Sequence, residues 1–156
     1  MLIYFLRHAE AEDCADSDFE RHLTVKGLEQ ADKAGKFCAR YGLIPDAVLS
    51  SPVVRAKQTA EIVCKRLGEP RLTIESWIAC GMSPAACLGE LRAYEQLASV
   101  MVVGHEPDFS DTIAVMIGLP NPERLHIRKA SLTAVNLRSF QPGGGQIEFS
   151  IPVRLM

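Results

Sequence analysis

The sequence predicts an α/β fold in three layers, with helices on both faces of a mainly parallel sheet and an antiparallel hairpin at the C-terminal end. Two short runs, residues 2–6 and 100–103, are wholly apolar, as in strands buried on both faces of a parallel sheet. Helical patterns alternate with strand-like segments as far as residue 117, which is typical of crossover connections. Two alternating segments then flank a glycine-rich turn, which indicates a hairpin.

The individual elements follow from periodicity and from their start and stop signals. Residues 2–6 form the first strand, and Thr24 caps a helix over residues 25–40 that ends before Gly42. Its apolar stripe is expected to contain Leu28, Ala31, Ala34, Gly35 and Cys38. Residues 47–49 form a second strand. The Ser51-Pro52 pair predicts a cap followed by a helix that runs to Leu67 and stops at Gly68.

The second half of the chain repeats these signals. Residues 72–75 predict a third strand, and Ser83-Pro84 opens a helix that we expect to reach Leu97. Residues 100–103 form the fourth strand, and Pro107 opens a helix through Ile117 that Gly118 closes. Residues 131–137 and 147–151 then form the hairpin strands around a turn at residues 141–146.

Length and composition limit the class of protein. With 156 residues, 47% hydrophobic and 23% charged, the chain is expected to form a single domain over residues 1–156, without room for a helical cap. Seventeen basic residues against 19 acidic ones give a net charge of −2, which argues against a general nucleic-acid binder. No apolar run approaches the ~20 residues of a membrane span, and five cysteines without a C-x-x-C pair predict reduced thiols in the cytoplasm.

Arginine and histidine side chains follow three of the predicted parallel strands. Arg7 and His8 follow the first strand, Arg55 lies in the first helical turn after the second, and His105 follows the fourth. Ligands of such sheets bind beyond the carboxyl ends of the strands. One histidine alone would more often be structural, and Arg55 alone could pair with Glu61 or Glu69. Their shared placement beside helix N-termini predicts an anion site.

Four segments resemble the histidine phosphatase (phosphoglycerate mutase-like) superfamily. The sequence LRHAE at residues 6–10 resembles its R-H-G/A opening, SSPVVRAKQTA at 50–60 resembles its S-P-x-x-R-x-x-Q-T-A segment, and VGHE at 103–106 resembles its third motif. RHLTVKG at residues 21–27 is similar to the R-x-L-T-x-x-G segment of the short, SixA-like phosphohistidine phosphatases. The resemblance spans the chain in order and implies a phosphoglycerate mutase-like fold and phosphatase activity.

The residue types suit phosphoryl transfer. A neutral imidazole attacks an anionic phosphoryl group without charge repulsion, so His8 is the expected nucleophile. Arg7 and Arg55 can each bind phosphoryl oxygens with a guanidinium fork, and His105 can donate to the same group. We therefore expect no metal or other cofactor. The resemblance implies Arg21 as a third phosphate contact, with a solvated loop arginine as the alternative; His22 and His126 are expected to be structural.

The chain lacks an obvious proton donor for the leaving group. Larger members of the superfamily use a carboxylic acid beyond the third strand, where residues 76–83 here contain none. Glu106 and Asp108 flank His105, and either could serve, or could simply favour a helix start. An alkoxide leaving group needs a proton, whereas a phosphohistidine imidazole takes one from solvent.

We therefore expect a phosphatase for phosphohistidine on a phosphotransfer protein. The alternatives are a phosphomonoesterase for small phosphorylated molecules and, from another class, a non-catalytic phospho-binding module.

Overall fold

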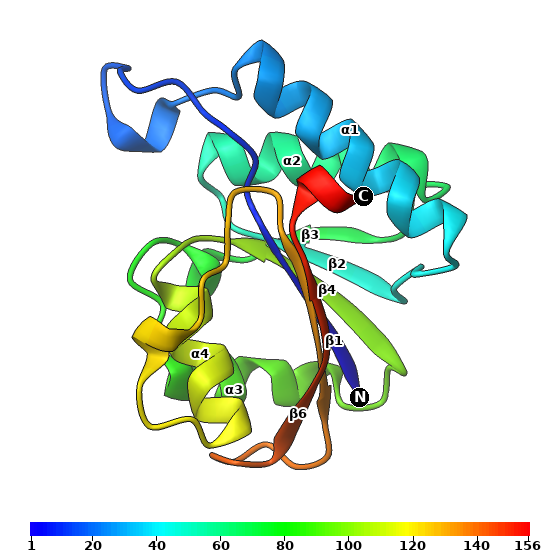
Figure 1. The fold of residues 1–156 in the computed structure, drawn as a ribbon, viewed down its shortest axis with the longest axis vertical. Coiled ribbons are helices and arrows are strands. Elements are labelled where there is room, and N and C mark those ends of the chain that lie inside the picture. Colours follow the sequence, from blue (N-terminus) through cyan, green and yellow to red (C-terminus); the bar gives the residue numbers. More distant parts are fainter.

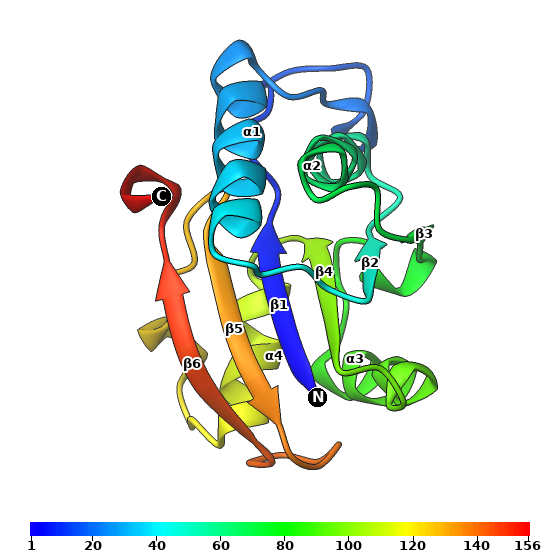
Figure 2. The ribbon, with the colours of Figure 1, turned by 90° about the vertical axis from the view of Figure 1, so that its right-hand side faces the viewer.

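The computed structural model describes residues 1–156 and contains one six-stranded sheet. Its strands, in the spatial order β3-β2-β4-β1-β5-β6, are β1 (Leu2–Arg7), β2 (Ala47–Ser50), β3 (Leu72–Ile74), β4 (Ser99–Gly104), β5 (Leu132–Leu137) and β6 (Gly145–Ile151). Strands β1 to β4 pair in parallel, whereas β5 is antiparallel to both β1 and β6. The predicted mainly parallel sheet with a C-terminal antiparallel hairpin is confirmed (Figures 1 and 2).

Two pairs of helices cover the two faces of the sheet. Helices α1 (Val25–Arg40) and α2 (Val54–Arg66) cover one face, and α3 (Pro84–Leu91) and α4 (Asp108–Ile117) cover the other (Figure 1). Strand β1 shows why the layers form: Tyr4 and Leu6 point to the first pair, and Ile3 and Phe5 to the second. Side chains alternate along a strand, so a wholly apolar strand supplies both cores.

Helix α1 matches its predicted limits, and its Thr24 hydroxyl accepts a hydrogen bond from the Gly27 amide at 3.0 Å. The predicted place of Leu28 in the buried stripe is wrong, because its side chain is 43% exposed. The buried stripe begins one residue earlier, at Gly27. There the helix approaches the chain after β1 so closely that a Cβ atom would lie 1.9 Å from the Glu10 carbonyl oxygen.

Two helix limits differ from the prediction by more than one residue. Helix α2 begins at Val54 rather than at Pro52, since its first carbonyl acceptor is that of Val53, which accepts the Ala56 and Lys57 amides at 3.0 Å. The Ser51 hydroxyl accepts the Val53 amide at 3.2 Å and also contacts His105. Helix α3 begins after Ser83 as predicted but ends at Leu91, not Leu97. A short 3₁₀ turn, Arg92–Tyr94, follows it.

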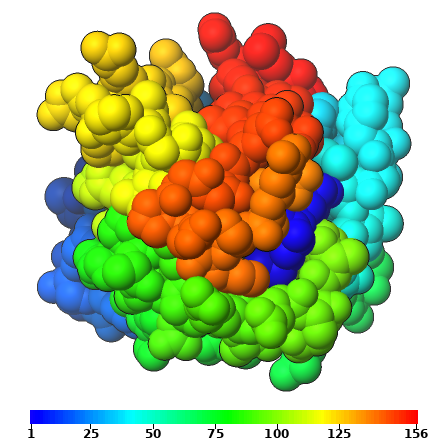
Figure 3. All heavy atoms as spheres, turned by 90° about the horizontal axis from the view of Figure 1, so that it is seen from below, coloured from blue at the N-terminus to red at the C-terminus, as the bar shows by residue number.

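The two ends of the sheet differ in character. At the amino end of the parallel strands, the hairpin turn lies against α3 (Figure 3), and Arg92 donates to the Phe140 carbonyl at 3.0 Å. At the carboxyl end, the loop that joins β1 to α1 lies beside the segments that follow β2 and β4 (Figure 2). None of the helices combines the length and apolar character needed to traverse a lipid bilayer.

Candidate active site

The histidines that follow β1 and β4 are brought together at the carboxyl edge of the sheet. His8 and His105 are 6% and 2% exposed, and their ring centroids lie 5.3 Å apart. The register explains this, because Arg7 at the end of β1 pairs with Gly104 at the end of β4. The His8 amide continues the pairing by donating to the Gly104 carbonyl at 2.9 Å.

The hydrogen bonds of His8 define its tautomer. Its Nδ1 lies 2.8 Å from the Ala9 carbonyl oxygen, which can only accept, so Nδ1 carries the ring proton. The lone pair of the neutral ring is therefore on Nε2, which lies 3.4 Å from Nε of Arg55. The pKa of His8 is lowered to about 3, mainly by burial. His105, Arg55 and Arg7 also lower this pKa, whereas the hydrogen bond to Ala9 acts to raise it. The neutral ring is the form that a nucleophile needs.

His105 is held by the residue that follows β2. Its Nε2 lies 2.8 Å from the Ser51 hydroxyl, while its buried Nδ1 has no hydrogen-bond partner. Burial, followed by the charge of Arg55, lowers the pKa of His105 to about 4. If the Ser51 hydroxyl donates to Nε2, the ring proton of neutral His105 is on Nδ1, where a bound anion can accept it.

Arg55 reaches the pair from the second residue of α2, where it is only 5% exposed. Its Nη1 donates to the Asp18 main-chain carbonyl at 2.6 Å, and its Nη2 to the Asp18 carboxylate at 2.9 Å. Nη2 also lies 3.6 Å from the sulfur of Cys80. Asp18 therefore occupies the guanidinium fork that the sequence predicts as a phosphoryl contact.

Arg7 ends β1 and is anchored by Nη1, which donates to the Ile127 carbonyl at 2.8 Å. Its Nε is buried without a partner. Burial lowers its pKa, opposed by the nearby Glu106 carboxylate. A buried donor without a partner is costly, so this Nε–H is suited to a bound anion.

Arg21 does not join this cluster directly. Its Nη1 pairs with the Asp18 carboxylate at 2.8 Å, and its Nε donates to the Glu12 carbonyl. Asp18 thus bridges the guanidinium groups of Arg21 and Arg55. His22 is exposed and lies 3.0 Å from Gln58, and His126 is exposed in the segment before β5.

The two carboxylates beside His105 differ in their contacts. Asp108 accepts the Gly81 amide at 2.9 Å, so it holds the loop before α3. Glu106 accepts from Ser110 through one oxygen, while its other oxygen is buried without a partner. Burial raises the pKa of Glu106, although the hydrogen bond from Ser110 and the charge of Arg7 act to lower it. Burial also raises the pKa of Asp108, so the two carboxylates differ mainly in the buried, partnerless oxygen of Glu106.

Three polar residues of the site were missed by the sequence reasoning. Thr59, fully buried, accepts the Ala9 amide at 3.1 Å and donates to the Arg55 carbonyl at 2.7 Å, so it joins the chain beside His8 to α2. Thr59 and Ser51 both lie in the S-P-x-x-R-x-x-Q-T-A segment, which was the available signal. No sequence signal pointed to Asp18, apart from its place in an acidic loop.

Comparisons with known proteins point to one family. Residues 3–81 match the model of the histidine phosphatase superfamily (branch 1). An uncharacterised Picosynechococcus protein is 32% identical over 143 residues, covering 89% of this chain and 86% of its own. The Haemophilus influenzae phosphohistidine phosphatase SixA homolog is 34% identical over 134 residues, covering 78% of this chain and 80% of its own.

A solved structure supports the same fold. The protein histidine phosphatase SixA complexed with tungstate superimposes with a TM-score of 0.90 at 24% identity, covering 99% of this chain and 98% of that one. The chain therefore belongs to the histidine phosphatase superfamily and has its phosphoglycerate mutase-like fold. It is a phosphatase of the SixA-like branch.

Proposed function

We propose that this phosphatase removes the phosphoryl group from phosphohistidine on another protein, through a phospho-His8 intermediate and without a metal ion. The orientation of His8 is the observation that carries the proposal. Nδ1 donates to the Ala9 carbonyl, so the lone pair on Nε2 faces the buried guanidinium of Arg55. A nucleophile beside an anion clamp is the arrangement that phosphoryl transfer requires.

In the proposed first step, the phosphoryl group displaces the Asp18 carboxylate from Arg55, Arg7 and Arg55 bind its oxygens, and Nε2 of His8 attacks phosphorus. The bond from phosphorus to the substrate nitrogen breaks as the bond to His8 forms, and the departing imidazole takes a proton from solvent. The Nδ1–H of His105 donates to an equatorial oxygen as charge spreads over the phosphoryl group. Water then attacks the phosphorus of phospho-His8, releasing phosphate and the neutral histidine.

The choice of substrate follows from the proton donors. Asp108 is bound to the Gly81 amide, and Glu106 shares one oxygen with Ser110. A phosphohistidine needs neither carboxylate, because its imidazole leaves as a neutral ring after protonation from water. The similarity to the SixA homolog supports the same substrate class.

We further propose that residues 1–156 act as one domain in which no helical cap covers the candidate site, so that a residue on a protein surface can approach it. All five cysteines are unpaired thiols, which favours a cytoplasmic location.

The direct test compares wild-type protein with His8→Ala on a phosphohistidine-bearing phosphotransfer protein. Phosphate release by wild type, and none by the variant, is expected. If wild type releases no phosphate, or if His8→Ala matches it, the proposal fails. Labelling of His8 by an acid-labile phosphoryl group would also exclude a non-catalytic phospho-binding module, which has no use for a nucleophile.

Glu106 favours a second candidate, a phosphomonoesterase for small phosphorylated molecules. Its buried, partnerless oxygen and raised pKa are features of a general acid. Under this alternative, Glu106→Gln lowers turnover of alkyl phosphates about 100-fold or more. Under the main proposal, it leaves phosphohistidine hydrolysis within about twofold, because the leaving imidazole needs no protein acid.

A further inference from the structure

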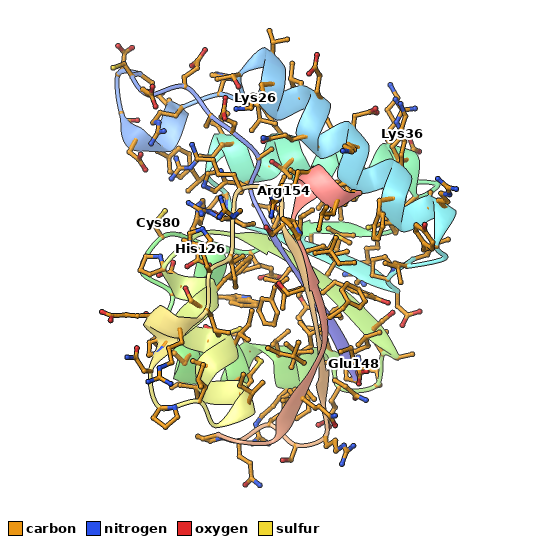
Figure 4. The ribbon with its side chains drawn as sticks, viewed as in Figure 1. Lys26, Lys36, Cys80, His126, Glu148 and Arg154 are labelled. Carbon is orange, nitrogen blue, oxygen red and sulfur yellow. The ribbon has the colours of Figure 1, made fainter.

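A strongly basic groove of about 460 Å³ adjoins the candidate active site. We call it the cationic groove. It is built from α1, from the segment before β5 and from the C-terminal residues, which lie on one flank of the molecule (Figure 4). No acidic residue lines it. The basic groups that line it are Arg7, Lys26, His126, Arg128, Lys129 and Arg154.

Most of this charge is not neutralised within the protein. Lys26 pairs with Glu10 at 2.8 Å, whereas Arg128, Lys129 and Arg154 form no ion pair. Arg128 and Arg154 are exposed to solvent. Like charges gathered around one hollow create a positive potential that an acidic ligand lowers. The groove therefore concentrates positive charge in a chain whose net charge is −2.

Arg7 connects the cationic groove to the candidate active site. This residue lines the groove and precedes His8 in the chain. A second hollow includes Val54, the neighbour of Arg55, and is lined by Glu12, Asp16 and Glu20 together with His22. One hollow with a basic lining therefore includes Arg7 of the candidate site, and a separate hollow with an acidic lining lies next to Arg55.

We propose that the cationic groove docks an acidic segment of the protein substrate while its phosphohistidine occupies the pocket. The inference rests on the proposed function and adds the chemistry by which the partner is recognised. A protein fits this site better than a nucleic acid does, for two reasons. No Phe, Tyr or Trp lines the groove to stack on bases, and the acidic hollow would repel a long polyanion.

The test uses synthetic phosphohistidine peptides of equal length. Two carry four glutamates, on the N-terminal or the C-terminal flank, and the third carries glutamines instead. We expect wild-type protein to hydrolyse at least one acidic peptide with a kcat/KM about tenfold higher than the glutamine peptide, mainly through KM. The advantage should vanish between about 50 and about 500 mM salt, because salt screens exposed charges.

The decisive variant is Arg128→Glu/Arg154→Glu, which reverses two exposed charges of the groove. It should abolish the preference for the acidic peptide while its activity on the glutamine peptide stays near that of wild type. The matched control, Arg71→Glu/Arg138→Glu, makes the same charge change at the amino end of the sheet, where Arg71 precedes β3 and Arg138 follows β5. It should keep the preference.

Each result separates the docking proposal from the proposed function. Equal rates on all peptides, or a preference that survives in the groove variant, would overturn the docking proposal while phosphohistidine hydrolysis stands. If no peptide is hydrolysed, the proposed function fails and the docking proposal falls with it. Inhibition by a 20-nucleotide single-stranded DNA, lost in the groove variant without loss of the peptide preference, would assign the groove to nucleic acid instead.

Discussion

The burial of His8 predicts a specific dependence of stability on pH. The fold lowers the pKa of His8 to about 3, whereas an unfolded chain restores a value near 6.5. Between these values the unfolded state binds a proton that the folded state does not, so the free energy of unfolding falls as the pH falls. The contribution of neutral, buried His8 to the free energy of unfolding is therefore complete above about pH 6.5 and decreases as the pH falls towards 3.

The magnitude follows from the width of that window. Each pH unit between the two pKa values changes the free energy of unfolding by about 1.4 kcal/mol. Lowering the pH from about 7 to about 4.5 therefore costs about 2.5 kcal/mol through His8 alone. In His8→Asn this contribution disappears, so the variant should lose about 2.5 kcal/mol less than wild type over the same change in pH.

Urea unfolding at the two pH values measures this difference. His126→Asn, which removes an exposed histidine, is the matched control and should behave as wild type does. Equal losses in wild type and His8→Asn, to within about 0.5 kcal/mol, would refute the argument. Such a result would mean that the folded protein does not hold His8 in its neutral form.

Three further predictions concern the supports of the site. Asp18→Asn should tighten inhibition by tungstate about two- to fivefold, because it removes an exposed carboxylate from the Arg55 fork; weaker inhibition would mean that Asp18 positions Arg55. Thr59→Val should cost about 1–3 kcal/mol in urea unfolding and lower kcat, with recovery in Thr59→Ser, because it leaves the buried Ala9 amide without its acceptor. Gly27→Ala should cost about 1–3 kcal/mol by overpacking, since its Cβ would lie 1.9 Å from the Glu10 carbonyl oxygen. The control Gly89→Ala, whose Cβ would meet no atom nearby, should cost nothing. Equal melting temperatures of the two variants would contradict this prediction.

Much of the fold could be predicted from local sequence signals. The limits of α1 followed from Thr24 and from helical periodicity, and the parallel core strands followed from their unbroken apolar runs. The error at the start of α2 concerns a side chain that also serves a distant partner. Ser51 resembles a helix cap in the sequence, but its hydroxyl is bound to His105, 54 residues away.

The candidate site was only partly predictable for a related reason. Arg7, His8, Arg55 and His105 could be placed at one edge, because parallel strands end together there. The contacts between Asp18 and Arg55 depend on how the loop before α1 folds back over α2, and no local pattern encodes that. For the same reason, Arg21 lies behind Asp18 rather than against His8.

Trapping the phosphorylated enzyme tests the central claim, nucleophilic attack by His8, most directly. Wild-type protein is mixed with a ³²P-labelled phosphohistidine peptide, quenched in base within the first turnover and digested. We predict base-stable, acid-labile label on the peptide that contains His8, formed and lost at rates compatible with turnover and absent from His8→Asn. Turnover without labelled enzyme, or label on a residue other than His8, would contradict the account.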